Sequence, residues 1–348
     1  MINLDLRHLG SSSEVYLCHD GGYFPVLINP QGEEILAIVR AGAGHIGITG
    51  RLAGVRSLDR GQTWQEAIVI VDCDADDRNP AVGCAPDGTI VLAYHGQGSY
   101  NKDGSWAGDL RRVQMRMTWS DNNGVTWEEP QPLNYTPMEK HSAYGRIITL
   151  PDNTMLLPIY GSRISATSRT RDHAYILRSH DNGRNWDEPS LIAEGYNETA
   201  LLLLPNGDLI GAIRSDDRGQ FLAIVRSTDG GRTWSEPTPV THTREHPADL
   251  TLLSNGWMVM YYGVRHPPFG VQARVSKDAG KTWDMQLIVC DDLGDNDLGY
   301  PSTVKLNDRL VTAYYCAPHG GNNPDFRGEG AFARASLYSE TALIEALS

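Results

Sequence analysis

One eight-residue phrase recurs five times along the chain, and it constrains the fold more than any other feature. Its pattern is S-x-D-x-G-x-T-W, with Asn122 replacing the aspartate in the second copy and Asn185 replacing the threonine in the third. In such a phrase Asp and Ser side chains bond nearby backbone N–H groups, glycine supplies a positive φ, and tryptophan packs beneath the turn. The phrase therefore predicts five tight turns, far from any catalytic chemistry. The copies are SLDRGQTW (57–64), SDNNGVTW (120–127), SHDNGRNW (179–186), STDGGRTW (227–234) and SKDAGKTW (276–283).

A second, weaker repeat lies between the boxes. Six segments each contain two β-rich runs around a short turn, which is typical of a hairpin. The boxes start 63, 59, 48 and 49 residues apart, a spacing that fits one four-stranded sheet per copy. We therefore predict an all-β fold, a six-bladed β-propeller with four antiparallel strands per blade, as a single domain over residues 1–348. The only helical pattern is ETALIEAL, from Glu340. The hairpins begin at Tyr23, Asn79, Tyr144, Asn197, His246 and Tyr300.

Composition excludes several classes of partner. The net charge of −13 repels phosphate backbones and anionic lipid, so neither nucleic acid nor a membrane is expected as a partner. The five cysteines are scattered and never form a CxxC pair, and no His/Cys spacing is typical of zinc, so no metal and no cofactor is predicted. Two acidic runs, 74–77 and 291–297, are interpreted as solvated loops. The chain begins without a basic and apolar leader, which predicts a cytoplasmic protein unless a leader has been removed.

The ends of the hairpin strands suggest where a site forms. In a propeller the innermost strands line a central channel, so residues at one end of them converge on the axis. These positions are rich in Tyr, His and Arg, although the whole chain is acidic, and such a pocket suits a small anionic ligand such as a sugar acid. They are Tyr23, Arg78, Asn79, Tyr144, Arg146, Glu198, His246 and Tyr300 on the first strands, and Arg40, His95, Tyr160, Arg163, Arg214, Arg265 and Tyr315 on the second.

With these boxes and hairpins, the chain resembles the sialidase (neuraminidase) superfamily of six-bladed propellers. The resemblance implies a tyrosine nucleophile, a glutamate that takes its proton, an acid/base aspartate and three arginines that bind the substrate carboxylate. GYPSTV resembles the family's tyrosine segment and makes Tyr300 the candidate nucleophile. NETALLLLPNGDLIGAIR resembles the Asn-Glu stretch, so Glu198 becomes the base and Arg214 one carboxylate ligand. Arg265, in GVRHPPFG, fits another.

Two positions depart from the family pattern. The family's first arginine, in an Arg-Ile-Pro phrase, aligns with Tyr23, and Arg40 or Arg78 would have to replace it from a neighbouring strand. The acid/base aspartate aligns with His45, in the loop RAGAGHIGITGR. A histidine can serve either as general acid or as general base because its ordinary pKa lies near 6.5.

Three functions are compatible with this set. The leading hypothesis is an exo-acting, sialidase-like glycoside hydrolase that removes a terminal acidic sugar from a glycan, with Tyr300, Glu198 and His45 as catalytic residues. Arg214, Arg265, Arg40, Arg78, Tyr23, His95, Tyr144, Arg146 and His246 are then the expected substrate-binding residues. The second hypothesis is a lyase acting on uronic acids, because histidine, tyrosine and arginines also suit abstraction of a proton next to a carboxylate. The third is a propeller that binds carbohydrate without catalysis. The sequence names neither the sugar nor the oligomeric state.

Overall fold

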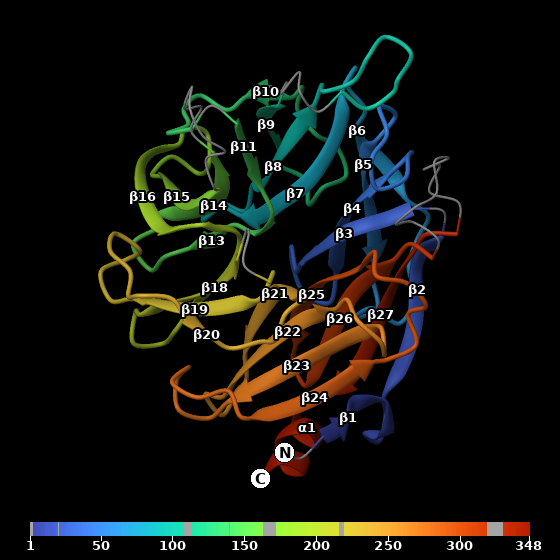
Figure 1. Cartoon of the computed structure of the whole chain (residues 1–348), viewed down its shortest axis with the longest axis vertical. Coiled ribbons are helices and arrows are strands. Elements are labelled where there is room, and N and C mark those ends of the chain that lie inside the picture. Colours follow the sequence, from blue (N-terminus) through green and yellow to red (C-terminus); the bar gives the residue numbers. More distant parts are fainter. Residues whose placement is uncertain are drawn as a thin grey trace.

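The computed structural model describes residues 3–19, 21–107, 113–138, 140–162, 172–215, 219–318 and 330–348. Its strands form six small sheets in a ring, so the predicted six-bladed propeller is confirmed (Figure 1). Five of the six hairpins that the sequence indicated supply the two inner strands of one sheet, whereas in the hairpin from Tyr144 the first run is divided between two sheets.

The blades follow one another along the chain, each from its inner to its outer strand. The first is β3 (Gly21–Ile28), β4 (Ile35–Ala41), β5 (Arg51–Ser57) and β6 (Ile68–Val71). The second is β7 (Asp76–Cys84), β8 (Ile90–Gln97), β9 (Val113–Ser120) and β10 (Gln131–Pro132). The third contains β11 (Lys140–Ala143) and β13 (Ile148–Thr149), both paired with β14 (Met155–Ser162), then β15 (His173–Ser179) and β16 (Asp187–Glu194).

The other three blades complete the ring. The fourth is β17 (Tyr196–Leu203), β18 (Leu209–Ser215), β19 (Leu222–Ser227) and β20 (Thr238–Pro239). The fifth is β21 (Glu245–Leu252), β22 (Met258–Val264), β23 (Gly270–Ser276) and β24 (Met285–Cys290), with β1 (Asn3–Asp5) added in parallel at its edge. The sixth is β25 (Leu298–Leu306), β26 (Arg309–Cys316), β27 (Phe332–Ser339) and β2 (Ser13–His19).

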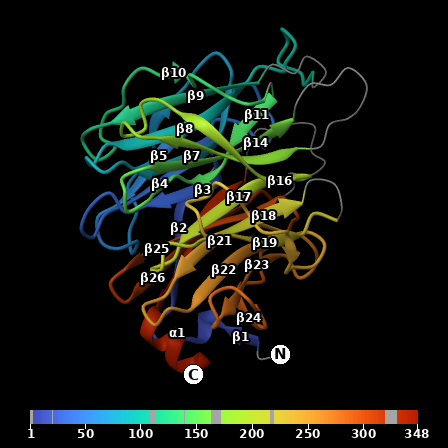
Figure 2. The same cartoon turned by 90° about the vertical axis from the view of Figure 1, so that its left-hand side faces the viewer.

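The sixth blade closes the ring with strands from both ends of the chain. β2 pairs with β27, so an N-terminal strand completes a sheet built from the C-terminal part of the sequence. Helix α1 (Glu340–Leu347) follows β27 as the sequence predicted, and it lies beside β1 and the short 3-10 helix η1 (Leu6–His8) in both views (Figure 1 and Figure 2). In the described ranges no helix is long and apolar enough to span a bilayer.

Each box connects the third and fourth strands of its blade, away from the inner strands, as predicted. In the fourth copy the Asp229 carboxylate accepts hydrogen bonds from the amide and the hydroxyl of Thr233, at 2.9 and 2.6 Å. The indole of Trp234 donates to the carbonyl of Gly231 at 3.1 Å. The box aspartates are thus used within their own turns, which is a structural role.

The third box carries a tryptophan with no exposed surface, Trp186. Its indole donates to Gly183 at 3.0 Å, and the ring packs in the core shared by the second and third blades. We expect Trp186→Ala to lower the free energy of unfolding by about 3–5 kcal/mol, because the change leaves a large cavity. Chemical denaturation measures this, with Trp64→Ala, in a partly exposed box, as the matched control. Equal losses for the two variants would contradict the prediction.

Candidate active site

The inner strands are distorted at the end where the predicted site residues lie. Phe24, Asn79 and Tyr300 have φ values of 54°, 53° and 51°, and each precedes a proline. All three lie within β-bulges, because the pairing register shifts between Tyr23 and Val26, between Arg78 and Ala81, and between Gly299 and Ser302. Bulges redirect side chains next to active sites, and positive φ at a non-glycine residue stores backbone strain. At these bulges the Phe24 and Tyr300 rings come together, with centres 4.8 Å apart, and the Asn79 amide donates to the Tyr160 hydroxyl at 2.9 Å.

The predicted pair of Tyr300 and Glu198 is present. The Tyr300 hydroxyl donates to Glu198 Oε1 at 2.6 Å, although 102 residues separate the two in sequence. The other carboxylate oxygen accepts from Arg214 Nη1 at 2.7 Å, and the same nitrogen lies 3.4 Å from the Tyr300 hydroxyl. Both Tyr300 and Glu198 are buried. A phenol in contact with an ion-paired carboxylate is the arrangement of an activated nucleophile and its base.

The surroundings of Tyr300 keep it protonated at rest. Burial raises the pKa of its phenol, and the Glu198 carboxylate raises it further, against the opposing effect of Arg214 and Arg265. Burial alone would lower the pKa of the Arg214 guanidinium, but Glu198 and Tyr300 raise it above its ordinary value. Tyr300 is therefore a neutral phenol that donates its hydrogen bond to Glu198.

Several buried donors beside this pair lack partners. The guanidinium carbon of Arg265 lies 5.4 Å from the centre of the Tyr300 ring. Among the described residues nothing hydrogen-bonds to Nε and Nη2 of Arg265, to Nε of Arg214, or to either ring nitrogen of the fully buried His246. Burial, together with Arg214, Arg265 and Arg244, lowers the pKa of His246 far below its usual value. A buried polar group left unpaired costs about 1–3 kcal/mol, so this cluster is prepared for an anionic ligand.

The loop that carries His45 is held down by buried ions. Arg40 has no exposed surface, and it bonds to Asp76 Oδ1 through two nitrogens at 2.9 and 2.7 Å and to the carbonyl oxygen of Gly44. The Tyr100 hydroxyl donates to the other Asp76 oxygen at 2.6 Å and accepts from the Gly47 amide at 3.0 Å. A Cβ at Gly50 would lie 1.9 Å from Asp76, so only glycine fits there. Arg40 thus positions the loop and has no surface with which to touch a ligand.

Asp297 is a residue of this site that was not predicted from the sequence. Its Oδ1 lies 2.9 Å from His45 Nδ1 and accepts from the Tyr315 hydroxyl at 2.6 Å. The interpretation of both acidic runs as solvated loops was wrong at this residue and at Asp76 and Asp77, because all three are buried. The one signal in the sequence that could have identified Asp297 is its position three residues before Tyr300. A run of acidic residues does not show which of its members is buried.

Comparison with known proteins shows to which family the chain belongs. The family model for the BNR repeat-like domain matches residues 54–313. The chain belongs to the BNR repeat-like family. A search of curated protein sequences finds no match.

Solved structures similar to this BNR repeat-like chain are also propellers. A protein of unknown function from Dyadobacter fermentans is 22% identical with a TM-score of 0.78, over 94% of this chain and 98% of that one. A Hadza microbial sialidase is 19% identical with a TM-score of 0.69, over 92% and 66%. A Trypanosoma rangeli sialidase in complex with 2,3-difluorosialic acid is 15% identical with a TM-score of 0.72, over 97% and 60%. The chain therefore spans about two thirds of the sialidases' length, and at these identities the likeness shows the fold.

The other predicted residues of the BNR repeat-like site differ in how far they are buried and in what they contact. Tyr23 is buried against Tyr315, with ring centres 5.1 Å apart, and burial raises its pKa to about 12. Arg78 lies 5.7 Å from the ring centre of Phe24, the residue that follows Tyr23, which aligns with the family's first arginine. His95 bonds to Ser142 at 2.5 Å, and burial lowers its pKa.

Two further predicted residues bond to the backbone of β25, the strand that carries Tyr300. Tyr144 donates to the Tyr300 carbonyl at 3.3 Å. Arg146 lies in β12 (Gly145–Arg146), which pairs in parallel with β7, and it bonds to Asp249 and to the Thr303 carbonyl at 2.6 and 2.8 Å. The Arg146 guanidinium is thus bonded to groups within the protein. Arg163 lies outside the described residues.

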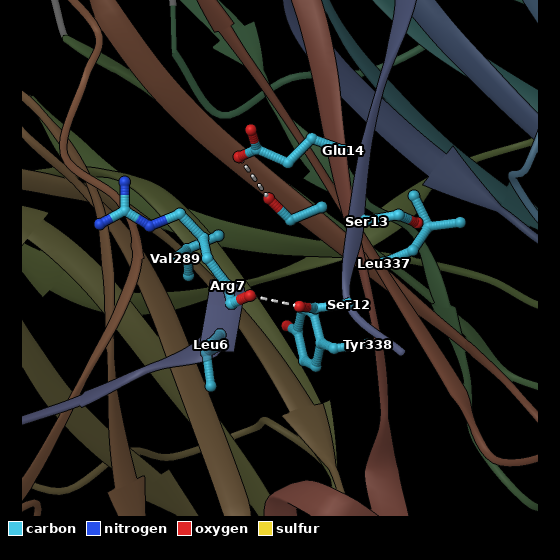
Figure 3. A pocket seen from close by; sticks show the side chains of 9 residues that line it. Leu6, Arg7, Ser12, Ser13, Glu14, Val289, Leu337 and Tyr338 are labelled. Carbon is cyan, nitrogen blue, oxygen red and sulfur yellow. Dashed lines mark hydrogen bonds between the residues drawn. The ribbon is translucent and has the colours of Figure 1, made fainter. Parts of the chain in front are cut away.

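A separate cavity of the BNR repeat-like chain lies at the outer strands (Figure 3). It is bounded by η1, β24, β2 and β27, and its polar groups bond mainly to the protein, such as the Ser12 hydroxyl to the Arg7 carbonyl at 2.5 Å and Ser336 to Glu14 at 3.4 Å. It holds none of the predicted site residues. Its lining residues are Leu6, Arg7, Ser12, Ser13, Glu14, Val289, Ser336, Leu337 and Tyr338.

Proposed function

We propose that this protein is an exo-acting glycoside hydrolase that releases a terminal sugar acid from a glycan through a tyrosyl-linked intermediate. The observation that carries the proposal is the 2.6 Å hydrogen bond from Tyr300 to Glu198, beside buried nitrogens of Arg214, Arg265 and His246 to which no described residue hydrogen-bonds. The likeness of the fold to sialidases supports it, including one crystallised with 2,3-difluorosialic acid as a covalent intermediate.

The first half of the reaction joins the sugar to the enzyme. Tyr300 Oη attacks the anomeric carbon while Glu198 takes the phenolic proton. The electron pair of the glycosidic bond goes to the leaving oxygen, which receives a proton from Nε2 of His45. In the second half His45 removes a proton from water, the water oxygen displaces Tyr300 from the anomeric carbon, and Glu198 returns the proton to the phenolate.

The unpaired donors recognise the carboxylate of the sugar. Arg214 and Arg265 come from neighbouring blades, and arginines bind carboxylates through paired N–H groups better than lysines do. With a net charge of −13 on the chain, such a local concentration of cations selects a small anion rather than a polyanion. His246 belongs to the same cluster, so we assign it to the sugar and not to the leaving group. Arg78 lies beside the Phe24 ring and pairs with Asp76 at 3.4 Å.

One assay separates this function from its rivals. The protein is incubated with sialosides, glycosides of other keto-sugar acids, and uronic-acid-capped oligosaccharides, and both free sugar and ultraviolet absorbance are recorded. Release of free sugar acid without absorbance is expected. Absorbance from an unsaturated product would instead show a lyase, and tight binding without either signal would show a carbohydrate-binding propeller.

The pH dependence of kcat/KM follows from His45. Burial lowers the pKa of His45 below its usual value, and Arg78 and Arg40 lower it further against the opposing effect of Asp297. The imidazolium form is the acid of the first step, so kcat/KM falls as pH rises through this lowered pKa, and the optimum is acidic. Substrates with an aryl leaving group that needs no proton should show a weaker fall. A rate for the natural linkage that stays constant up to pH 8 would contradict the assignment.

A further inference from the structure

The side-chain carboxyl group of Asp297 contacts the imidazole of His45, although 252 residues separate the two in sequence. It lies immediately before β25, the strand that carries Tyr300, and it is almost fully buried. We propose that Asp297 is a positioning residue that makes His45 the acid/base of this site. The inference rests on the proposed function, and it replaces the single aspartate that the family resemblance implied with an aspartate–histidine pair.

The bond fixes which nitrogen of His45 works. An ionised carboxylate only accepts hydrogen bonds, so the nitrogen 2.9 Å from Asp297, Nδ1, carries a proton. Although burial alone would raise the pKa of Asp297, His45 and Tyr315 hold it below its usual value, so the carboxylate form persists. Nε2 is then the nitrogen that exchanges a proton with the substrate. The His45 side chain is 31% exposed, which leaves it accessible to a leaving group.

Packing holds the imidazole in one plane. The rings of Phe24 and Tyr23 meet it edge to face, with centres 5.3 and 6.1 Å away. Asp297 is equally fixed, since its Oδ1 also accepts from Tyr315 and its carbonyl accepts from the Ala317 amide at 2.8 Å. A general acid must be held in this way, because small errors in its direction reduce the rate strongly.

The charges around His45 show why a carboxylate is required. Arg78 and Arg40 both oppose a positive charge on the imidazole, as does burial, while Tyr23 and Tyr315 are neutral phenols. Arg40 is already paired with Asp76. Asp297 is the group that offsets these effects, so it keeps a protonated His45 available in the acidic range where the first step operates.

Asp297→Asn tests the proposal, because it preserves shape and removes the charge. For a substrate with a natural leaving group we expect a loss in kcat of about 10²-fold or more, and a descending limb of the pH profile that moves to lower pH. An activated aryl glycoside should lose much less. Asp291→Asn is the matched control, since Asp291 belongs to the same acidic run but is exposed and paired with Arg7. A loss of similar size for both substrates, with an unmoved limb, would overturn the proposal.

A double-mutant cycle with His45→Ala separates positioning from a structural role. If Asp297 acts through His45, Asp297→Asn costs little once His45 is absent, whereas independent effects would multiply. Nuclear magnetic resonance of labelled histidine gives a readout without turnover. In the wild type His45 should carry its proton on Nδ1 when neutral, and Asp297→Asn should move its titration to lower pH. An unchanged titration of His45 would refute its pairing with Asp297, and this readout does not require turnover. If the titration shifts as expected but the protein hydrolyses no glycoside, the proposed function is refuted and the pairing is not.

Discussion

Tyr300→Phe is expected to reduce turnover by at least about 10³-fold, the largest effect of any single substitution considered, since it removes the atom that bonds to the sugar. The fold should survive. Glu198 keeps its ion pair with Arg214 but its buried Oε1 loses a hydrogen-bond donor, so the free energy of unfolding should fall by about 1–3 kcal/mol.

The measurement combines steady-state rates with trapping of the intermediate. A fluorinated sugar-acid inhibitor should add its mass to the peptide that contains Tyr300 in the wild type and fail to do so in Tyr300→Phe. Tyr338→Phe is the control, because Tyr338 is also buried but bonds to Tyr261 and Thr312 in the outer part of the fold. A Tyr300→Phe variant that retains more than about a tenth of the turnover would exclude the tyrosyl intermediate.

His45→Ala should have the second largest effect, a loss of about 10²–10⁴-fold in turnover of natural linkages, as is typical when a general acid or base is removed. The loss should be smaller for activated aryl glycosides, which leave without a proton. His45→Asp should restore part of the activity if the reaction resembles that of sialidases, whereas a lyase that needs histidine as its base should not recover.

The control for this variant is His180→Ala, because His180 is an exposed residue of the third box. Rates on an unactivated substrate decide the question. If His45→Ala turns over that substrate as fast as the wild type, the loop residue has no part in catalysis, and His95 or His246 becomes the candidate acid/base residue.

The architecture could be predicted from the amino-acid sequence alone, because the signals for it are local. In a box such as Ser227–Trp234 the polar side chains hydrogen-bond to other groups within the same eight residues. The turn can therefore be predicted from its local sequence, without any tertiary contact. The same holds for the hairpin turns, whose positions predicted the inner strand pairs. Tyr300, Glu198 and Arg214 were predicted together because a family resemblance supplied their relation and the strand ends supplied their place.

The closure of the ring and the burial of particular charged residues could not be predicted in this way, because both depend on contacts between residues far apart in the sequence. The pairing of β2 with β27 joins residues about 320 positions apart, for example Ser13 with Leu337, and nothing local indicates it. Likewise, the inner strand of the third blade is divided, because its segment β12 pairs with β7 of the neighbouring second blade.

The arginines and aspartates of the site show the same limit. Arg40 and Arg146 were expected to bind substrate, yet Asp76 and Asp249 engage them within the protein. Asp297 was read as a loop residue, yet it is buried against His45. A charged side chain has the same local pattern whether it faces water or a distant partner, since burial of a charge depends on a counter-charge that only the folded chain brings near.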